Sequence, residues 1–222
     1  HAVQELQSRS ICILYEDSQF GNEYLEGVRQ GLEKTKFHTD FMVEIPYSQH
    51  DISFEQQISM FKQSEADTII FLATGSAIVE FVNQLGVEFI VGKNLMGPSH
   101  INQSRFSSFL DQKGIFFTTC NLIPNPEDST LEITKEYHAA TQEFGIAPGT
   151  FSFEAYLNTD ILLYILSKVE GEITPQKIIA FASTLKEYNH KGIILNFNPE
   201  THQLSPYVWI ATPDGTWIPH KQ

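Results

Sequence analysis

Short apolar runs alternate with segments of helical periodicity through the first half of the chain. The apolar runs lie at residues 11–15, 41–45, 68–74, 94–99 and 114–120. They contain few polar residues, which is typical of strands buried on both faces of a parallel sheet. After the first run, Leu25, Val28 and Leu32 recur at helical spacing, with Asn22 as the expected helix cap. The pattern therefore predicts an α/β fold, a doubly wound parallel sheet of five strands with helices on both faces.

The pattern changes after the fifth run. A stretch with two prolines follows, and then three helices are predicted, at about 126–144, 151–169 and 174–188. Thr174 and Pro175 form a pair that is typical of a helix start. The chain ends in a hairpin-like segment, 192–217, whose turn signals are Asn198-Pro199 and Asp214-Gly215. A short helix at 103–112 is also expected, before the fifth strand.

The charge balance narrows the range of partners. The chain carries a formal net charge of -13 over 222 residues. A surface this acidic repels nucleic-acid phosphates and anionic lipid head groups, so we expect no nucleic acid and no membrane surface as a partner. No apolar stretch approaches the roughly 20 residues needed to cross a bilayer. The chain begins with His1 and not with methionine, so we expect a processed form or a fragment.

The two cysteines, Cys12 and Cys120, lie in the first and fifth apolar runs. In a sheet of order 2-1-3-4-5, two strands separate them, which corresponds to roughly 14 Å. A disulfide needs Cα atoms within about 7 Å of each other. We therefore predict two free thiols that are buried and behave as small hydrophobic side chains.

Polar and aromatic residues follow three of the predicted strands, at 16–20, 74–76 and 97–100. In an open parallel sheet, ligands bind at this carboxyl edge. A phospho-accepting receiver domain also carries acids after its first strand, as Glu16 and Asp17 are here. Such a domain needs an aspartate after the third strand and a lysine after the fifth, and this chain has Thr74 and no lysine there. The sequence therefore argues against a receiver domain.

The sequence motifs give little support for an enzyme. Ser76 lies between a strand and a helix, as the nucleophile of a G-x-S-x-G elbow does, but both required glycines are missing. We expect Ser76 to cap a helix instead. The eight histidines are scattered without ligand spacing, so we expect no metal and no other cofactor. We predict no catalytic residues.

Five segments, in order along the chain, resemble the type 1 periplasmic binding proteins, the leucine/isoleucine/valine-binding family. They are 13–34 (ILYEDSQFGNEYLEGVRQGLEK), 66–86 (ADTIIFLATGSAIVEFVNQLG), 94–102 (NLMGPSHIN), 150–166 (TFSFEAYLNTDILLYIL) and 192–217 (GIILNFNPETHQLSPYVWIATPDGTW). The resemblance implies a two-lobed clamshell that closes on a small ligand without covalent chemistry. It assigns 8–122 and 191–222 to lobe two, and 123–190 to the crossover and helices of a partial lobe one, whose N-terminal part is missing.

The resemblance also implies a ligand site, a location and partners. Its binding residues would be Phe20, Thr74, Gly75, Ser76, Ser99 and Phe151. It implies a solute-binding or ligand-sensing protein of the periplasm or extracellular space. Such a protein holds an amino acid or a similar polar metabolite for a membrane transporter or receptor. Glu16 and Asp17 are expected to be solvated or to tie down their loop.

Two departures from the family pattern keep an alternative open. Ser99 stands where the family has an acid that holds the ammonium group of the ligand, and a neutral hydroxyl binds a cation less strongly. The missing part of lobe one would supply contacts to the ligand carboxylate. The alternative is a regulatory or protein-interaction module that keeps the fold without binding small molecules. The predicted helix at 151–169 is apolar around most of its circumference, so we expect self-association of the chain as given.

Overall fold

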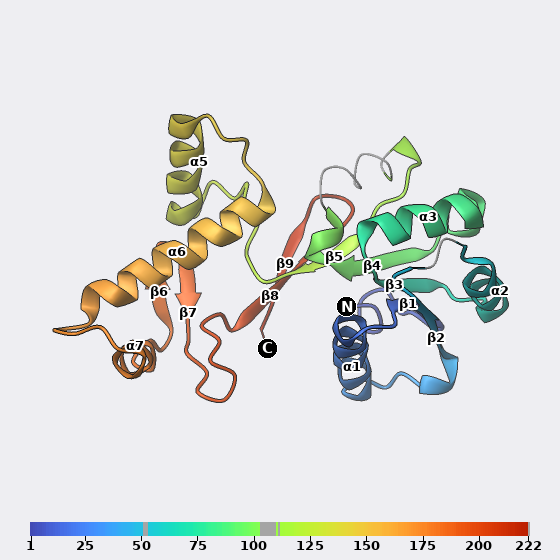
Figure 1. Ribbon diagram of the computed structural model, residues 1–222, viewed down its shortest axis with the longest axis horizontal. Helices are drawn as coiled ribbons and strands as arrows, with labels where there is room; N and C mark the ends of the chain where they lie inside the picture. Colours follow the sequence, from blue (N-terminus) through green and yellow to red (C-terminus); the bar gives the residue numbers. More distant parts are fainter. Residues whose placement is uncertain (51–52, 103–109, 111, 222) are drawn as a thin grey trace. The chain divides into compact units, whose positions relative to one another are not determined.

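The computed structural model describes residues 1–50, 53–102, 110 and 112–221 (Figure 1). The chain divides into two compact units. The first contains residues 1–120 and 212–216, and the second contains residues 121–211 and 217–222. The assignment of 8–122 with 191–222 to one lobe, and of 123–190 to another, stays a prediction.

Five parallel strands form the sheet of the first unit. They are β1 (Ile11–Glu16), β2 (Met42–Tyr47), β3 (Thr68–Leu72), β4 (Asn94–Pro98) and β5 (Thr118–Asn121). They lie in the order β2-β1-β3-β4-β5. The register places Leu14 of β1 between Ile45 of β2 and Phe71 of β3. The predicted α/β fold and its strand order are therefore confirmed.

Helices cover both faces of this sheet. On one face, α1 (Gln19–Glu33) packs Leu25 and Leu32 against Ile11 and Ile13. On the other, α2 (Glu55–Ser64) and α3 (Gly75–Leu85) enclose a larger core. Successive residues of a strand point to opposite faces, which explains how Ile11 and Ile13 enter one core while Cys12 and Leu14 enter the other. Figure 1 shows α1 apart from α2 and α3 across the sheet.

Short elements complete the first unit. Three 3-10 helices lie at Thr39–Phe41 (η1), Val87–Phe89 (η2) and Ser99–Asn102 (η3). The predicted helix at 103–112 falls largely outside the described residues. Cys12 is buried and Cys120 is exposed, and both are free thiols. The prediction of free thiols is confirmed, but the prediction that Cys120 is buried is wrong, because its side chain points out of β5 toward an open part of the sheet face.

The second unit is built from three helices and two hairpins. The helices are α5 (Glu132–Phe144), α6 (Thr150–Lys168) and α7 (Pro175–Ala182). One hairpin pairs β6 (Tyr188–His190) with β7 (Ile193–Leu195), and the other pairs β8 (Tyr207–Ala211) with β9 (Trp217–Lys221). The turn of the second hairpin contains Asp214 and Gly215, as predicted, and Gly215 adopts a φ of +85° that favours glycine.

Buried side chains on α6 recur every fourth residue. Phe153, Leu157, Ile161 and Ile165 pack with Ile133 of α5 and with the β6–β7 hairpin in one apolar core.

The Thr174 hydroxyl accepts a hydrogen bond from the Lys177 N–H and caps α7, as the Thr174-Pro175 pair predicts. Helix α7 ends at Ala182, earlier than predicted, because the chain turns there and buries Leu185 in the same core.

No helix in the described part of the chain is long and apolar enough to cross a membrane.

Candidate functional site

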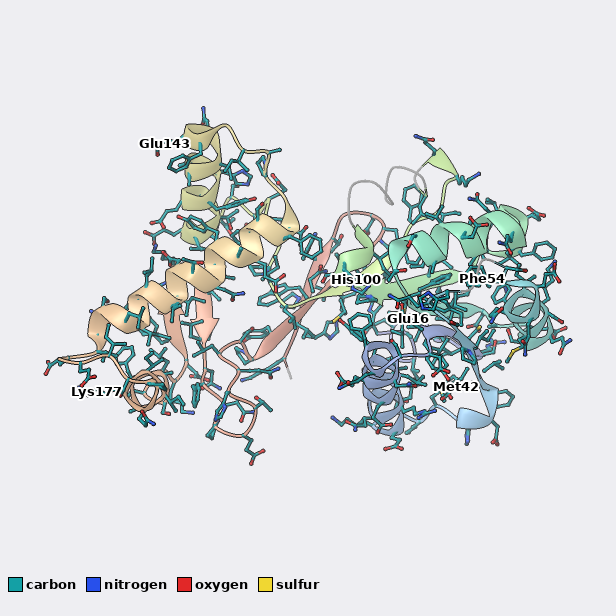
Figure 2. The ribbon with its side chains drawn as sticks, viewed as in Figure 1. Glu16, Met42, Phe54, His100, Glu143 and Lys177 are labelled. Carbon is teal, nitrogen blue, oxygen red and sulfur yellow. The ribbon has the colours of Figure 1, made fainter. Side chains whose placement is uncertain are left out.

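Three rings gather at the carboxyl edge of the first unit. Phe20 and Tyr24 lie one turn apart on α1, with ring centroids 4.7 Å apart. His100, from η3, lies 6.0 Å from the ring of Phe20 and 6.3 Å from that of Tyr24. Phe20 is 45% exposed, so the ring is presented to solvent and not packed into the core. Figure 2 labels His100 at this edge, together with Glu16 at the end of β1.

The position of Phe20 follows from the way α1 begins. Ser18 caps the helix, because its hydroxyl accepts a hydrogen bond from the Gly21 N–H at 3.3 Å. The prediction that Asn22 caps this helix is therefore wrong. Gly21 lies so close to β1 that a Cβ there would meet the carbonyl oxygen of Glu16 at 1.9 Å. Because Gly21 has no side chain, α1 can start directly against β1, and this holds Phe20 at the edge of the sheet.

Glu16 ties the ends of three strands together. Its buried carboxylate accepts a hydrogen bond from the Tyr47 hydroxyl at 3.3 Å. The oxygen of the Tyr47 hydroxyl in turn accepts a hydrogen bond from the Thr74 N–H at 3.3 Å. Burial raises the pKa of Tyr47 and outweighs the opposing effect of the Thr74 hydrogen bond, so the phenol remains a donor. Of the two expected roles for Glu16, solvation and tying down the loop, the structure shows the second.

The segment after β3 supplies small polar groups. Thr74 is the N-cap residue of α3, and its hydroxyl lies 3.3 Å from that of Ser76. Ser76 therefore lies inside the first turn, and the prediction that it caps the helix is wrong. The helix starts two residues earlier than predicted, at Gly75, which is buried, while Thr74 and Ser76 are both exposed.

The segment after β4 lies beside the segment after β3. His100 Nε2 lies 3.2 Å from the carbonyl oxygen of Ala73, the residue that directly follows β3. Ser99, directly before His100, is partly buried. The structure thus gathers Phe20, Thr74–Ser76 and Ser99 at one edge of the first unit. Phe151 lies in the second unit, as the second residue of α6, and is 47% exposed.

Three further residues at this edge were not predicted to belong to the site. Tyr24 lies four residues after Phe20, a spacing that places two rings on the same side of a helix. His100 follows Ser99 directly. It was placed at the carboxyl edge only as a member of the segment 97–100 and was not named as a binding residue. Tyr47 gave no signal of its own, because its contact with Glu16 depends on the pairing of β1 with β2.

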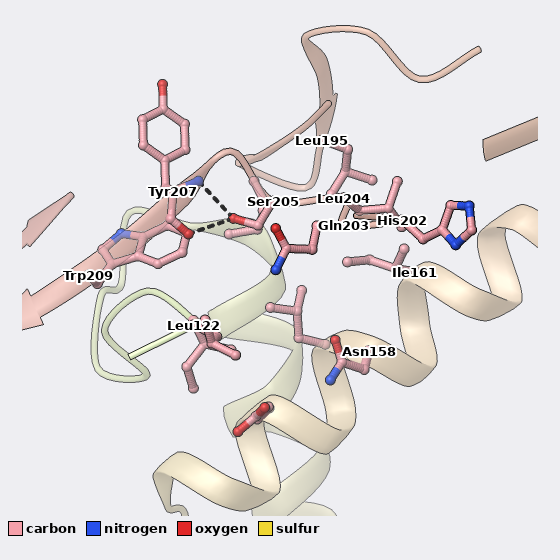
Figure 3. Close-up of a pocket in the computed structure, with 14 residues that line it drawn as sticks. Leu122, Asn158, Ile161, Leu195, His202, Gln203, Leu204, Ser205, Tyr207 and Trp209 are labelled. Carbon is pink, nitrogen blue, oxygen red and sulfur yellow. Dashed lines mark hydrogen bonds between the residues drawn. The ribbon is translucent and has the colours of Figure 1, made fainter. Parts of the chain in front are cut away.

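A separate pocket of about 310 Å³ lies within the second unit (Figure 3). Its lining residues come from the start of the unit, from α6, from β7, from the segment that leads into β8 and from β8 itself. They are Leu122, Ile123, Glu154, Leu157, Asn158, Ile161, Ile193, Leu195, His202, Gln203, Leu204, Ser205, Tyr207 and Trp209. None of the residues predicted to bind ligand is among them.

Several solved structures share this fold at low sequence identity. A substrate-binding periplasmic protein from Ralstonia solanacearum is 18% identical, with a TM-score of 0.76, over 99% of this chain and 63% of that chain. A possible leucine/isoleucine/valine-binding protein from Rhodopirellula baltica is 17% identical, with a TM-score of 0.79, over 99% of this chain and 61% of that chain. The chain thus spans about three fifths of the length of these proteins.

A third structure is described as a branched-chain amino acid transporter substrate-binding protein from Streptococcus pneumoniae in complex with isoleucine. It is 15% identical, with a TM-score of 0.69, over 100% of this chain and 62% of that chain. No curated protein matches the chain. A family model described as "Periplasmic binding protein" matches residues 1–216, nearly the whole chain. The match agrees with the sheet order and with the five segments that resemble this family, and the chain belongs to the periplasmic binding protein family.

Proposed function

We propose that the chain belongs to an extracytoplasmic solute-binding or ligand-sensing protein. It binds a small polar metabolite, such as an amino acid or a related compound, and presents it to a membrane transporter or receptor. The family supports this role, and one similar structure is described as a complex with isoleucine. The proposal involves no covalent chemistry.

The observation that carries the proposal is the exposed aromatic group at the carboxyl edge of the first unit. Phe20 lies beside Tyr24 and His100, on a helix start that Ser18 and Gly21 fix in place. A ring that is held rigidly and left in water loses little entropy when a ligand covers it. Phe20 is therefore the proposed apolar contact.

The polar contacts come from the neighbouring loops. Thr74 and Ser76 present hydroxyl groups at the start of α3, on either side of the buried Gly75. Ser99 adds a third hydroxyl after β4. Phe151 of α6, in the second unit, is proposed as a contact from the family resemblance alone. The five residues of the first unit form the proposed ligand site.

The ammonium group of an amino acid would need a carboxylate. Glu16 is buried and bound to Tyr47, so it is not available to a ligand. Asp17 is exposed, and its partner is the Asn22 amide at 3.5 Å. We therefore assign the ammonium contact to Asp17 if the ligand is an amino acid. A ligand without an ammonium group would use Ser99 and the hydroxyls near it.

Thermal unfolding of the chain with a panel of small metabolites tests the proposal. A ligand present at 100 times its dissociation constant adds about 2.7 kcal/mol to the unfolding free energy and raises the melting temperature. Ser99→Ala and Phe20→Ala should reduce the shift, whereas Val91→Ala, an exposed residue remote from the carboxyl ends of the strands, should not.

The alternative is a regulatory module that keeps the fold and binds no metabolite. The observation that favours it is the neutral Ser99 in place of an acid. In that case a folded chain shows no shift with any metabolite of the panel. Its partner would then be a protein, and the exposed rings at the carboxyl edge would be part of the contact.

A further inference from the structure

We propose that the pocket of the second unit binds a small organic cation with an apolar body. The proposal is independent of the metabolite site at the carboxyl edge of the first unit, because the two sites share no residue. Figure 3 shows the pocket between α6 and the segment that runs from His202 to Trp209.

The floor of the pocket is apolar and well packed. Leu157 and Ile161 of α6 are buried there, together with Ile123 and with Ile193 and Leu195 of β7. These side chains belong to the core of the second unit, so the floor is rigid. An aliphatic group placed on it gains roughly 25 cal/mol for each Å² of apolar surface removed from water.

Glu154 gives the pocket its charge. It is the one lining residue with a formal charge when histidine is neutral. Its carboxylate is half-buried, and the described part of the chain offers it no hydrogen-bond or ion-pair partner. Lys191, a cation of the same unit, is already held by Asp160 and Glu136 at 2.7 and 2.6 Å. A carboxylate left unpaired beside apolar walls favours a positively charged ligand.

Two aromatic rings add a second feature that suits a cation. Tyr207 and Trp209 both line the pocket, with centroids 6.0 Å apart and planes tilted by 50°. The faces of tyrosine and tryptophan attract cations, and tryptophan does so most strongly. The ammonium group of an alkylamine can therefore contact the carboxylate of Glu154 or the face of a ring, while the methylene groups of the same ligand contact the apolar floor.

The segment that carries these rings is fixed before any ligand arrives. The Ser205 hydroxyl donates to the Tyr207 carbonyl oxygen at 2.9 Å and accepts from the Tyr207 N–H at 3.1 Å (Figure 3). The volume of about 310 Å³ lies at the lower end of the range for ligand pockets. Both features favour a compact ligand, such as a short alkylamine.

Tryptophan fluorescence offers a direct test. The chain has two tryptophans, so Trp217→Phe leaves Trp209 as the reporter. This variant is titrated at pH 8 with pentylamine, which is protonated there, and with pentanol and pentanoate as neutral and anionic probes of the same length. We expect a saturable change with pentylamine, and at least tenfold weaker binding of pentanoate.

Glu154→Gln removes the charge of this side chain and nearly keeps its size, so it tests whether the charge contributes to binding. It should weaken pentylamine binding by roughly tenfold, as expected for the loss of a contact to a charged group, and leave pentanol binding unchanged. Glu143→Gln is the matched control, because Glu143 is exposed near the end of α5 and should have no effect. Phe20→Ala should also leave pentylamine binding unchanged, which distinguishes this site from the metabolite site.

Calorimetric titration of the unaltered chain repeats the measurement without relying on Trp217→Phe. Equal affinity for pentylamine and pentanoate would overturn the proposal, as would pentylamine binding that Glu154→Gln does not weaken. A folded chain that shows no saturable response to pentylamine would overturn it too.

Discussion

Phe20 combines an exposed ring with a fixed backbone position. Its neighbours Tyr24 and His100 lie at ring distances of 4.7 and 6.0 Å, but they do not enclose it. Phe54, by contrast, is 1% exposed and packs against the rings of Tyr47 and Phe81 (Figure 2). The two phenylalanines therefore belong to different classes, one available to a ligand and one structural.

We expect Phe20→Ala to change the free energy of unfolding by less than about 1 kcal/mol, because little apolar surface returns to water. Phe54→Ala, the comparison variant, should cost about 3–5 kcal/mol through the cavity that it leaves. Urea denaturation of both variants measures the difference. A loss of several kcal/mol in Phe20→Ala would make Phe20 a core residue and remove it from the proposed site.

Charged residues join the elements of the second unit. Asp160 of α6 lies 2.6 Å from His190 and 2.7 Å from Lys191, and Lys191 also binds Glu136 of α5 at 2.6 Å. Partial burial opposes ionisation of Asp160, but the hydrogen bonds from Lys191 and His190 outweigh it and lower its pKa. This network fixes two helices to the β6–β7 hairpin.

Asp160→Asn should therefore destabilise the second unit by about 2 kcal/mol at pH 7. A carboxylate whose pKa is lowered on folding contributes stability above its unfolded pKa of about 3.9, and that stability is lost as the pH falls through the folded pKa. The difference between the variant and the parent should thus shrink below about pH 4. Hydrogen exchange of α6 amides measures it, with the exposed Asp40→Asn as the control. A difference that is equal at pH 7 and pH 2.5 would contradict the assigned role of Asp160.

The glycines of helix α1 differ in the space that is available for a side chain. Gly21 faces the backbone of Glu16 at a distance that excludes any side chain, whereas a Cβ at Gly31 would meet nothing within 4 Å. Replacement of glycine by alanine within a helix normally gains up to about 1 kcal/mol. The gain depends on free space around the new side chain, which Gly31 has and Gly21 lacks.

Gly31→Ala should therefore stabilise the protein by about 0.5–1 kcal/mol. Gly21→Ala should destabilise it by about 2 kcal/mol or more, because either the helix or the strand must move. Thermal unfolding of the pair provides the comparison. If Gly21→Ala were as stable as Gly31→Ala, the close approach of α1 to β1, and with it the placement of Phe20, would be wrong.

Sequence patterns predicted most of the elements but few of the contacts between them. The strands and their order follow from apolar runs and from the handedness of crossovers, which are local signals. The pocket of the second unit could not be predicted, since it joins Leu122, Glu154 and Trp209, which lie far apart in the chain. The same holds for the link from Glu16 through Tyr47 to Thr74, which depends on strand register.

At the scale of the whole molecule, apolar residues remain exposed on the second unit. Leu162 and Leu163 of α6 are 46% and 60% exposed, and Ile179 of α7 is 45% exposed. The sequence predicted a helix apolar around most of its circumference, and the structure buries only one stripe of it. We propose that a second copy of the chain covers this surface.

Sedimentation should therefore show self-association of the 222-residue chain, which Leu162→Glu together with Leu163→Glu should abolish to give a monomer of 25.2 kDa. Charged side chains in an apolar contact carry a large desolvation cost. Val91→Glu, at a residue of the first unit that is 65% exposed, is the control and should change nothing. A parent chain that sediments as a monomer at every concentration would contradict the proposed contact.

We propose that the chain binds a small polar metabolite at the carboxyl edge of its first unit. Calorimetric titration with the metabolite that most raises the melting temperature, applied to the parent chain and to Ser99→Ala, tests this binding most directly. We expect saturable binding by the parent and binding at least several-fold weaker in Ser99→Ala, because a hydroxyl contact is lost. Equal affinity in the two proteins, or a folded parent chain that binds no metabolite of the panel, would contradict it.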